Sequence, residues 1–162
     1  MTNYEGLLRA LQSHGVSFIV IGGAAAIAHG SARLTQVLDV VYERSPTNLD
    51  RLVAALAPYS PYLRGAPKGL PFVWDRKTLE RGLNFTLETT IGDIDILGEM
   101  TGGGRYQDLA SGAVERRAFG ISCLWLSLPQ LIRAKRAAGR PKDLDALAEL
   151  EAIQEEQERQ PG

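Results

Sequence analysis

Residues 18–30, FIVIGGAAAIAHG, are the stretch of sequence from which the fold is deduced. The β-branched and aromatic residues at its start favour a buried strand, and the alanines that follow favour a short helix. Gly22 and Gly23 lie between the two, where missing side chains allow a sharp turn and the close approach of a ligand. A helix that begins behind such a turn presents free N–H groups to an anion, usually a phosphate.

Three aspartates lie on the strands that are expected beside this turn. Asp39 belongs to a predicted strand at 38–42, and a carboxylate there could hold a divalent cation against a bound phosphate. Asp93 and Asp95 share one face of a later predicted strand at 91–97, because side chains alternate along a strand. Aspartates inside apolar runs are costly unless they are paired or coordinate a metal, so the pattern favours a metal site.

These residues resemble the nucleotidyltransferase superfamily of DNA polymerase β, in particular its small bacterial stand-alone members, which include toxins of toxin–antitoxin pairs. The likeness rests on the Gly-Gly turn, the segment 29–35 and the strand that carries Asp39, and it extends from about residue 7 to residue 150. The segments 131–135 and 139–143 also resemble these proteins. The resemblance implies an α/β (α+β) fold in which helices flank a mixed, twisted sheet.

The resemblance also implies an activity: NTP-dependent, Mg²⁺-assisted nucleotidyl transfer to an RNA end, a protein hydroxyl or a small molecule, with an antitoxin protein as a further partner. In the family, Mg²⁺ ions bridge carboxylates to phosphate oxygens, and the third carboxylate of the pattern falls on Asp95. The first two positions fall on Val37 and Asp39. Valine donates no oxygen, which predicts a weakly active or inactive form. The alternative is a catalytically dead module that keeps nucleotide or partner binding.

The remaining candidate residues would contact the nucleotide. They are Gly22, Gly23, Ala24, Arg33, Thr35, Lys135, Arg140 and Lys142. Each cation could equally be a solvated surface charge, and Lys142 could instead pair with Asp143 at the start of a helix. Asp93 is interpreted as a substitute ligand or a supporting residue of the metal site. His29 could contact the substrate or cap its helix, and Cys123 is interpreted as a buried structural thiol.

The composition is that of an ordinary globular protein, with 44% hydrophobic and 23% charged residues among 162. The net charge of −1 argues against purely electrostatic binding of nucleic acid, although it allows a local basic patch. A single cysteine excludes an internal disulfide and a cysteine-rich zinc site. No apolar signal segment and no apolar run of about 20 residues is present, so we expect a cytoplasmic protein that does not enter a membrane.

The chain is expected to form one domain over residues 1–154, followed by a polar tail at 155–162 that frays. Residues 59–70 are rich in proline and glycine and are expected to form an extended loop. The triple glycine at 102–104 is interpreted as a connection and not as a phosphate-binding loop. The other expected helices are one at 2–14 capped by Thr2, one from Pro46 to Pro58, a short turn at 75–79, one at 127–138 and a last one that ends at about Ile153. Hairpins are expected at 84–97 and 115–125.

Overall fold

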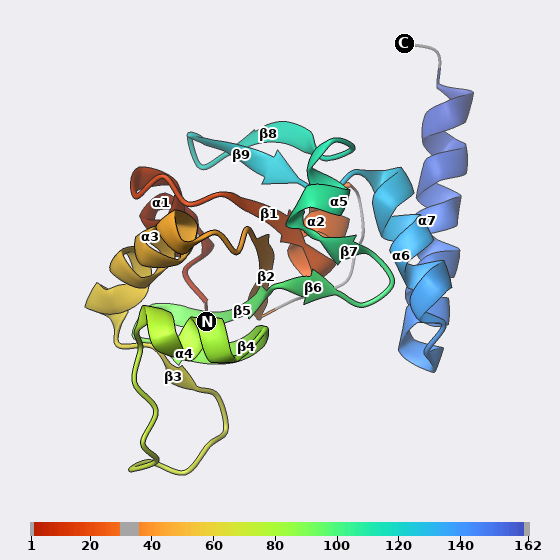
Figure 1. Ribbon diagram of the computed structural model, residues 1–162. Helices are drawn as coiled ribbons and strands as arrows, with labels where there is room; N and C mark the ends of the chain where they lie inside the picture. Colours follow the sequence, from red (N-terminus) through yellow and green to blue (C-terminus); the bar gives the residue numbers. More distant parts are fainter. Residues whose placement is uncertain (1, 30–35, 161–162) are drawn as a thin grey trace.

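The computed structural model describes residues 2–29 and 36–160. Helices and strands alternate along most of the chain, as Figure 1 shows. The helices are α1 Tyr4–Ser13, α2 Gly22–Ala28, α3 Pro46–Leu56, a 3₁₀ turn Ala57–Tyr59, α4 Arg76–Arg81, α5 Tyr106–Ala110, α6 Leu128–Ala138 and α7 Pro141–Arg159. The strands are β1 Phe18–Ile21, β2 Val37–Tyr42, β3 Tyr62–Leu63, β4 Asn84–Thr89, β5 Gly92–Leu97, β6 Glu99–Met100, β7 Gly104–Arg105, β8 Val114–Ala118 and β9 Ile121–Trp125.

Seven of the described strands form one mixed sheet in the order β3-β4-β5-β2-β1-β9-β8. The pairs β2–β5 and β1–β9 are parallel, whereas the other neighbours are antiparallel. Helix α1 packs against α3 and β9, and helix α6 packs against α7 and α2 (Figure 1). This arrangement confirms the expected α/β (α+β) fold, in which helices flank a mixed sheet. Among the described residues, no helix has the length and apolar character needed to cross a bilayer.

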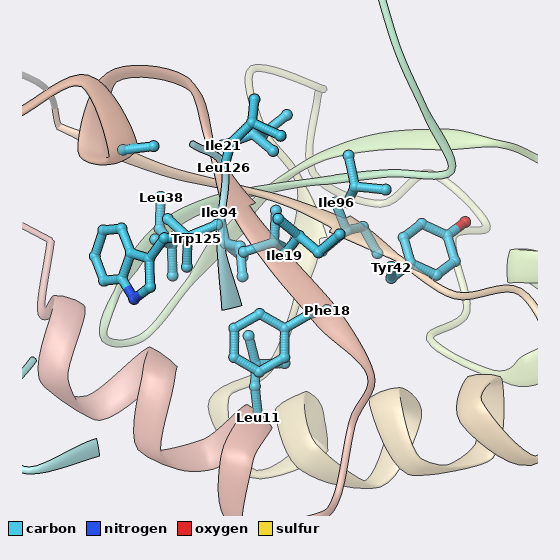
Figure 2. Close-up of a cluster of buried hydrophobic side chains, with 14 of the residues drawn as sticks. Leu11, Phe18, Ile19, Ile21, Leu38, Tyr42, Ile94, Ile96, Trp125 and Leu126 are labelled. Carbon is cyan, nitrogen blue, oxygen red and sulfur yellow. The ribbon is translucent and has the colours of Figure 1, made fainter. Parts of the chain in front are cut away.

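The central strands present a core face and an opposite face. Leu38 of β2 and Ile94 and Ile96 of β5 are fully buried, and Figure 2 shows them in one apolar cluster. Burying a side chain of this size contributes roughly 1.5–3 kcal/mol. Because side chains alternate along a strand, Asp39 and Asp95 lie on the opposite face of the same strands. The hydrophobic pattern that fixes the register therefore also fixes where the two carboxylates point.

Local capping signals predicted several helix starts correctly. Ser45 accepts a hydrogen bond from the backbone N–H of Asn48 at the start of α3, and Asp75 does the same for Thr78 in α4. Ser127 and Gln130 form the expected capping box of α6, with Ser127 N–H 2.9 Å from the Gln130 side-chain oxygen.

The first helix is capped differently from the prediction. Asn3, and not Thr2, is the N-cap of α1, because its side-chain oxygen accepts from the Gly6 N–H at 2.8 Å. The Thr2 hydroxyl is used elsewhere: it donates to the backbone carbonyl of Gln36 and accepts from the N–H of Asp93 at 3.1 Å. Thr2 thus links the start of β5 to the residue before β2.

Three other expectations are corrected. The loop at 59–70 contains β3, because Tyr62 and Leu63 pair with β4. The glycines at 102–104 connect a small hairpin, β6–β7, and the short helix α5 that follows was not expected. Helix α7 continues to Arg159, so most of the tail expected to fray is helical. Its glutamates and glutamines favour a helix, and Glu155 pairs with Arg159 one turn later at 3.6 Å.

Candidate functional site

Asp39 and Asp95 lie side by side, because β2 and β5 are parallel neighbours in which these two residues are register partners. Asp39 also reaches the start of α2, where a Cβ built on Gly22 would lie 2.3 Å from Oδ2 of Asp39. Gly22 has a φ of 69°, so this position requires glycine for its backbone as well as for space. The Gly23 N–H donates to the Asp39 carboxylate. Asp39 therefore lies beside both Asp95 and the glycine turn.

The environment of Asp39 raises the pKa of its carboxyl to about 7. Burial is the main cause, and the charge of Asp95 and a hydrogen bond with the Asp95 carboxyl act in the same direction. The Gly23 N–H and the Arg64 guanidinium oppose the increase. Near neutral pH, Asp39 therefore carries a proton for part of the time.

Arg64 is a residue of this site that sequence reasoning missed. Its Nη2 lies 2.7 Å from Oδ1 of Asp95, and its Nη1 donates to the backbone carbonyl of Leu87 at 3.2 Å. Arg64 directly follows β3, a strand of two residues inside a stretch rich in proline and glycine. No local pattern in such a stretch could have indicated that an arginine reaches Asp95.

A cavity of about 240 Å³ opens against Gly22 and Asp39. Its other described lining residues come from β1, from the end of β5 and the turn after β6, and from the junction of α6 and α7. They are Ile21, Leu97, Met100, Thr101, Ala134, Lys135, Ala138, Arg140, Lys142 and Asp143. The structure therefore brings five predicted residues to one cavity: Gly22, Asp39, Lys135, Arg140 and Lys142. A smaller cavity of about 80 Å³ touches Gly23 and Lys135.

The cations at the α6–α7 junction surround a buried carboxylate. The side chain of Asp143 is fully buried and accepts hydrogen bonds from Arg140 Nε at 2.5 Å and from Lys135 Nζ at 3.4 Å. Arg140, first of all, and then Lys135 hold the pKa of Asp143 down to about 2. Asp143 thus fixes two cations at the cavity wall, and sequence reasoning had considered Asp143 only as a partner for Lys142.

The remaining predicted residues lie elsewhere. Ala24 is half-buried and packs against the core, and Arg33 and Thr35 lie outside the described residues. His29 is buried, and its Nε2 lies 2.9 Å from the carbonyl oxygen of Leu126, so its ring links α2 to the residue after β9 and does not cap its own helix.

Two other predicted residues lie away from the cavity. Cys123 is only partly buried, which corrects the expectation of a buried thiol, and this partial burial raises the pKa of the thiol to about 11. Asp93 is the register partner of Val37 and does not line the cavity formed by the described residues. Asp95 is not among the described residues that line this cavity either. Asp95 is favoured over Asp93 as a ligand because Asp95, and not Asp93, is the register partner of Asp39.

The carboxylate pair fits one Mg²⁺ ion that arrives with phosphate oxygens. Mg²⁺ in nucleotide sites is commonly bound by one or two carboxylates, with substrate oxygens and waters completing the set. Val37 lies on the face of Asp39 and supplies no side-chain oxygen. Within residues 2–29 and 36–160, no group of three or more histidine, cysteine, aspartate or glutamate side chains could hold a metal. The donors present do not fit two ions held by the protein alone.

Comparison with known proteins adds no relative: no family model matches the chain, and no curated protein matches it. Function is therefore inferred from the chemistry of Asp39, Asp95 and the cavity beside them. The resemblance to nucleotidyltransferases stays a hypothesis that neither comparison supports.

The raised pKa of Asp39 predicts a pH-dependent stability. Because its pKa is about 7 in the folded protein and ordinarily 3.8, the folded state binds the extra proton between these values. The resulting stabilisation is complete below about pH 4 and is lost as the pH rises through about 7. We expect the free energy of unfolding to fall by about 1–3 kcal/mol between pH 5 and pH 8, and Asp39→Asn to remove most of this fall.

Urea denaturation at the two pH values measures the effect. Asp50→Asn is the control, since the Asp50 side chain is 61% exposed and lies at the surface near Arg76. It should keep the pH dependence of the unchanged protein. An Asp39→Asn variant that also keeps this dependence would show that the proton is not held at the carboxylate pair.

Proposed function

We propose that the protein is a nucleotidyltransferase-type protein that binds an NTP together with one Mg²⁺ ion and transfers the nucleotidyl group weakly. The observation that carries this proposal is the register pairing of Asp39 with Asp95, beside Gly22 and a cavity with Lys135 and Lys142 on its wall. Carboxylates on rigid strands suit Mg²⁺, and the lysines suit a triphosphate.

The residues of the site divide into two roles. Asp39 and Asp95 would hold the metal, which when bound would neutralise phosphate charge and lower the pKa of the attacking hydroxyl. Lys135 and Lys142 would bind phosphate oxygens across the cavity, and Asp143 would keep Lys135 in place. In the reaction, the acceptor oxygen forms a bond to the α-phosphorus while the bond to the leaving pyrophosphate breaks. Valine at position 37 leaves this chemistry without one oxygen ligand, so transfer is slow.

A second candidate is a module that binds nucleotide without transferring it. Two observations favour it: Val37 supplies no ligand, and the Arg64 guanidinium already neutralises Asp95 at 2.7 Å. The acceptor, whether an RNA end, a protein hydroxyl or a small molecule, belongs to the first candidate alone. A toxin role, an antitoxin partner and a cytoplasmic location extend the family likeness and rest on it alone.

Calorimetric titration with each of the four common NTPs, with and without Mg²⁺, tests nucleotide binding, which both candidate functions require. At least one NTP is expected to bind more tightly with Mg²⁺. Lys142→Met should weaken that binding about tenfold, because one charge-assisted contact to phosphate is lost. Lys77→Met is the matched control, since Lys77 is an exposed lysine of α4 outside the cavity.

The outcomes separate the candidates. No heat with any NTP would refute nucleotide binding altogether. Where binding is found, incubation with the labelled NTP, Mg²⁺ and a cell extract distinguishes them. Label that becomes covalently attached to an acceptor supports transfer, whereas bound label that is fully released on denaturation supports the binding module.

A further inference from the structure

Arg64 reaches the carboxylate pair from the edge of the sheet. Its backbone N–H donates to the carbonyl of Thr86 at 2.9 Å, which fixes Arg64 against β4. Thr86 is the register partner of Asp95, so the Arg64 side chain has only to cross β4 to reach β5. There, Nη2 contacts Asp95 while Nη1 is held by the carbonyl of Leu87. The backbone and side-chain hydrogen bonds of Arg64 therefore hold its guanidinium against Asp95, the proposed metal ligand.

This ion pair differs from another on the same segment. Lys68 and Glu88 are also 2.7 Å apart, but their side chains are 79% and 38% exposed. The side chains of Arg64 and Asp95 are only 28% and 20% exposed. Water and salt screen an exposed pair strongly and a partly buried pair much less. The Arg64 charge is thus felt by the carboxylates, whereas the Lys68 charge contributes little to its own pair.

We propose that Arg64 is the internal counter-ion of the Asp39–Asp95 pair and that it makes entry of a divalent cation depend on a bound triphosphate. This inference rests on the proposed nucleotide site. A free cation must compete with the guanidinium for Asp95 and finds two carboxylates at most. A cation carried by a triphosphate brings oxygen ligands of its own and needs fewer from the protein. Arg64 therefore sets a low affinity for free metal without excluding the metal–nucleotide complex.

Titration with Mn²⁺ alone, followed by the electron paramagnetic resonance signal of the free ion, tests the proposal. We expect Arg64→Gln to bind Mn²⁺ at least tenfold more tightly than the unchanged protein, because the competing charge is gone. Arg64→Lys keeps the charge and should stay close to the unchanged protein. Lys68→Gln is the matched control and should change nothing. Circular dichroism of each variant shows whether the fold is retained.

A second measurement needs no variant and holds even if Arg64→Gln fails to fold. After subtraction of the Mn²⁺ that the analogue binds in a protein-free solution, the unchanged protein should bind Mn²⁺ at least tenfold more tightly with a saturating, non-reacting α,β-methylene triphosphate analogue than without it. Equal Mn²⁺ affinities of folded Arg64→Gln and the unchanged protein, or equal affinities with and without the analogue, would overturn the inference but leave the nucleotide site standing. No Mn²⁺ binding under any of these conditions would overturn both the inference and the proposed function.

Discussion

Val37→Asp is expected to raise Mg²⁺-dependent nucleotidyl transfer by roughly a hundredfold or more. Val37 is half-buried on β2, two residues before Asp39 and on the same face of the sheet. An aspartate there would restore the oxygen ligand that the family likeness places at this position. A ligand that stabilises transition-state charge contributes several kcal/mol, and about 1.4 kcal/mol corresponds to a factor of ten in rate.

The same substitution should cost a little stability without metal. It adds a carboxylate beside Asp39 and opposite Asp93, and like charges repel. We therefore expect the melting temperature without Mg²⁺ to fall slightly and to recover when Mg²⁺ and NTP are present. Val114→Asp is a matched control, since Val114 is a half-buried valine at the start of another strand, β8. It should leave transfer unchanged.

Transfer of label from the NTP to an acceptor is measured for the unchanged protein and for each variant. Adding Asp39→Ala to the Val37→Asp variant should abolish transfer, because the pair of ligands is broken again. Unchanged activity in Val37→Asp, together with loss of activity in Asp39→Ala alone, would contradict the assignment of position 37 to the metal site.

Local signals account for the parts of the fold and site that the sequence predicted. Ser45 before Pro46, and Ser127 before Gln130, mark helix starts through contacts within three residues. The alternation of Leu38 and Asp39 decides which residue faces the core, because a strand has only two faces. Such signals need no knowledge of distant parts of the chain. The place of Asp39 beside the glycine turn was expected from the family resemblance, and the pairing of β1 with β2 produces it.

The residues that sequence reasoning missed depend on contacts between distant segments. Arg64 meets Asp95 across 31 positions of sequence, and only the pairing of β3 with β4 brings them together. Asp143 meets Arg140 locally, at the start of α7, but its contact with Lys135 forms only because α7 folds back on α6. The pairings of Arg64 with Asp95 and of Lys135 with Asp143 have no period or spacing that could be recognised before the sheet and the helix pair are known, whereas the spacing of Arg140 and Asp143 is that of a capping box.

Gly22→Ala is expected to destabilise the protein by about 2–4 kcal/mol and to lower its melting temperature by roughly 5–15 °C. Two causes add. The φ of 69° is a left-handed conformation that costs an alanine energy. The new Cβ would also lie 2.3 Å from Oδ2 and 3.0 Å from Cβ of Asp39, and Cβ cannot move away without shifting β2.

Gly120→Ala separates the two causes. Gly120 has a φ of 76°, and a Cβ there would meet no atom within 4 Å, so only the backbone cost remains. We expect this control to lose about 1–2 kcal/mol of stability.

A double variant tests the contact with Asp39 directly. Asp39→Ala in the Gly22→Ala background removes the carboxylate that the new methyl group would strike. Thermal melting should show that the double variant loses less stability than the sum of the losses in Gly22→Ala alone and Asp39→Ala alone. A Gly22→Ala variant no less stable than Gly120→Ala would mean that Asp39 does not approach the glycine turn. Asp39 would then not lie between the glycine turn and the cavity, and the proposed site would lose its central carboxylate.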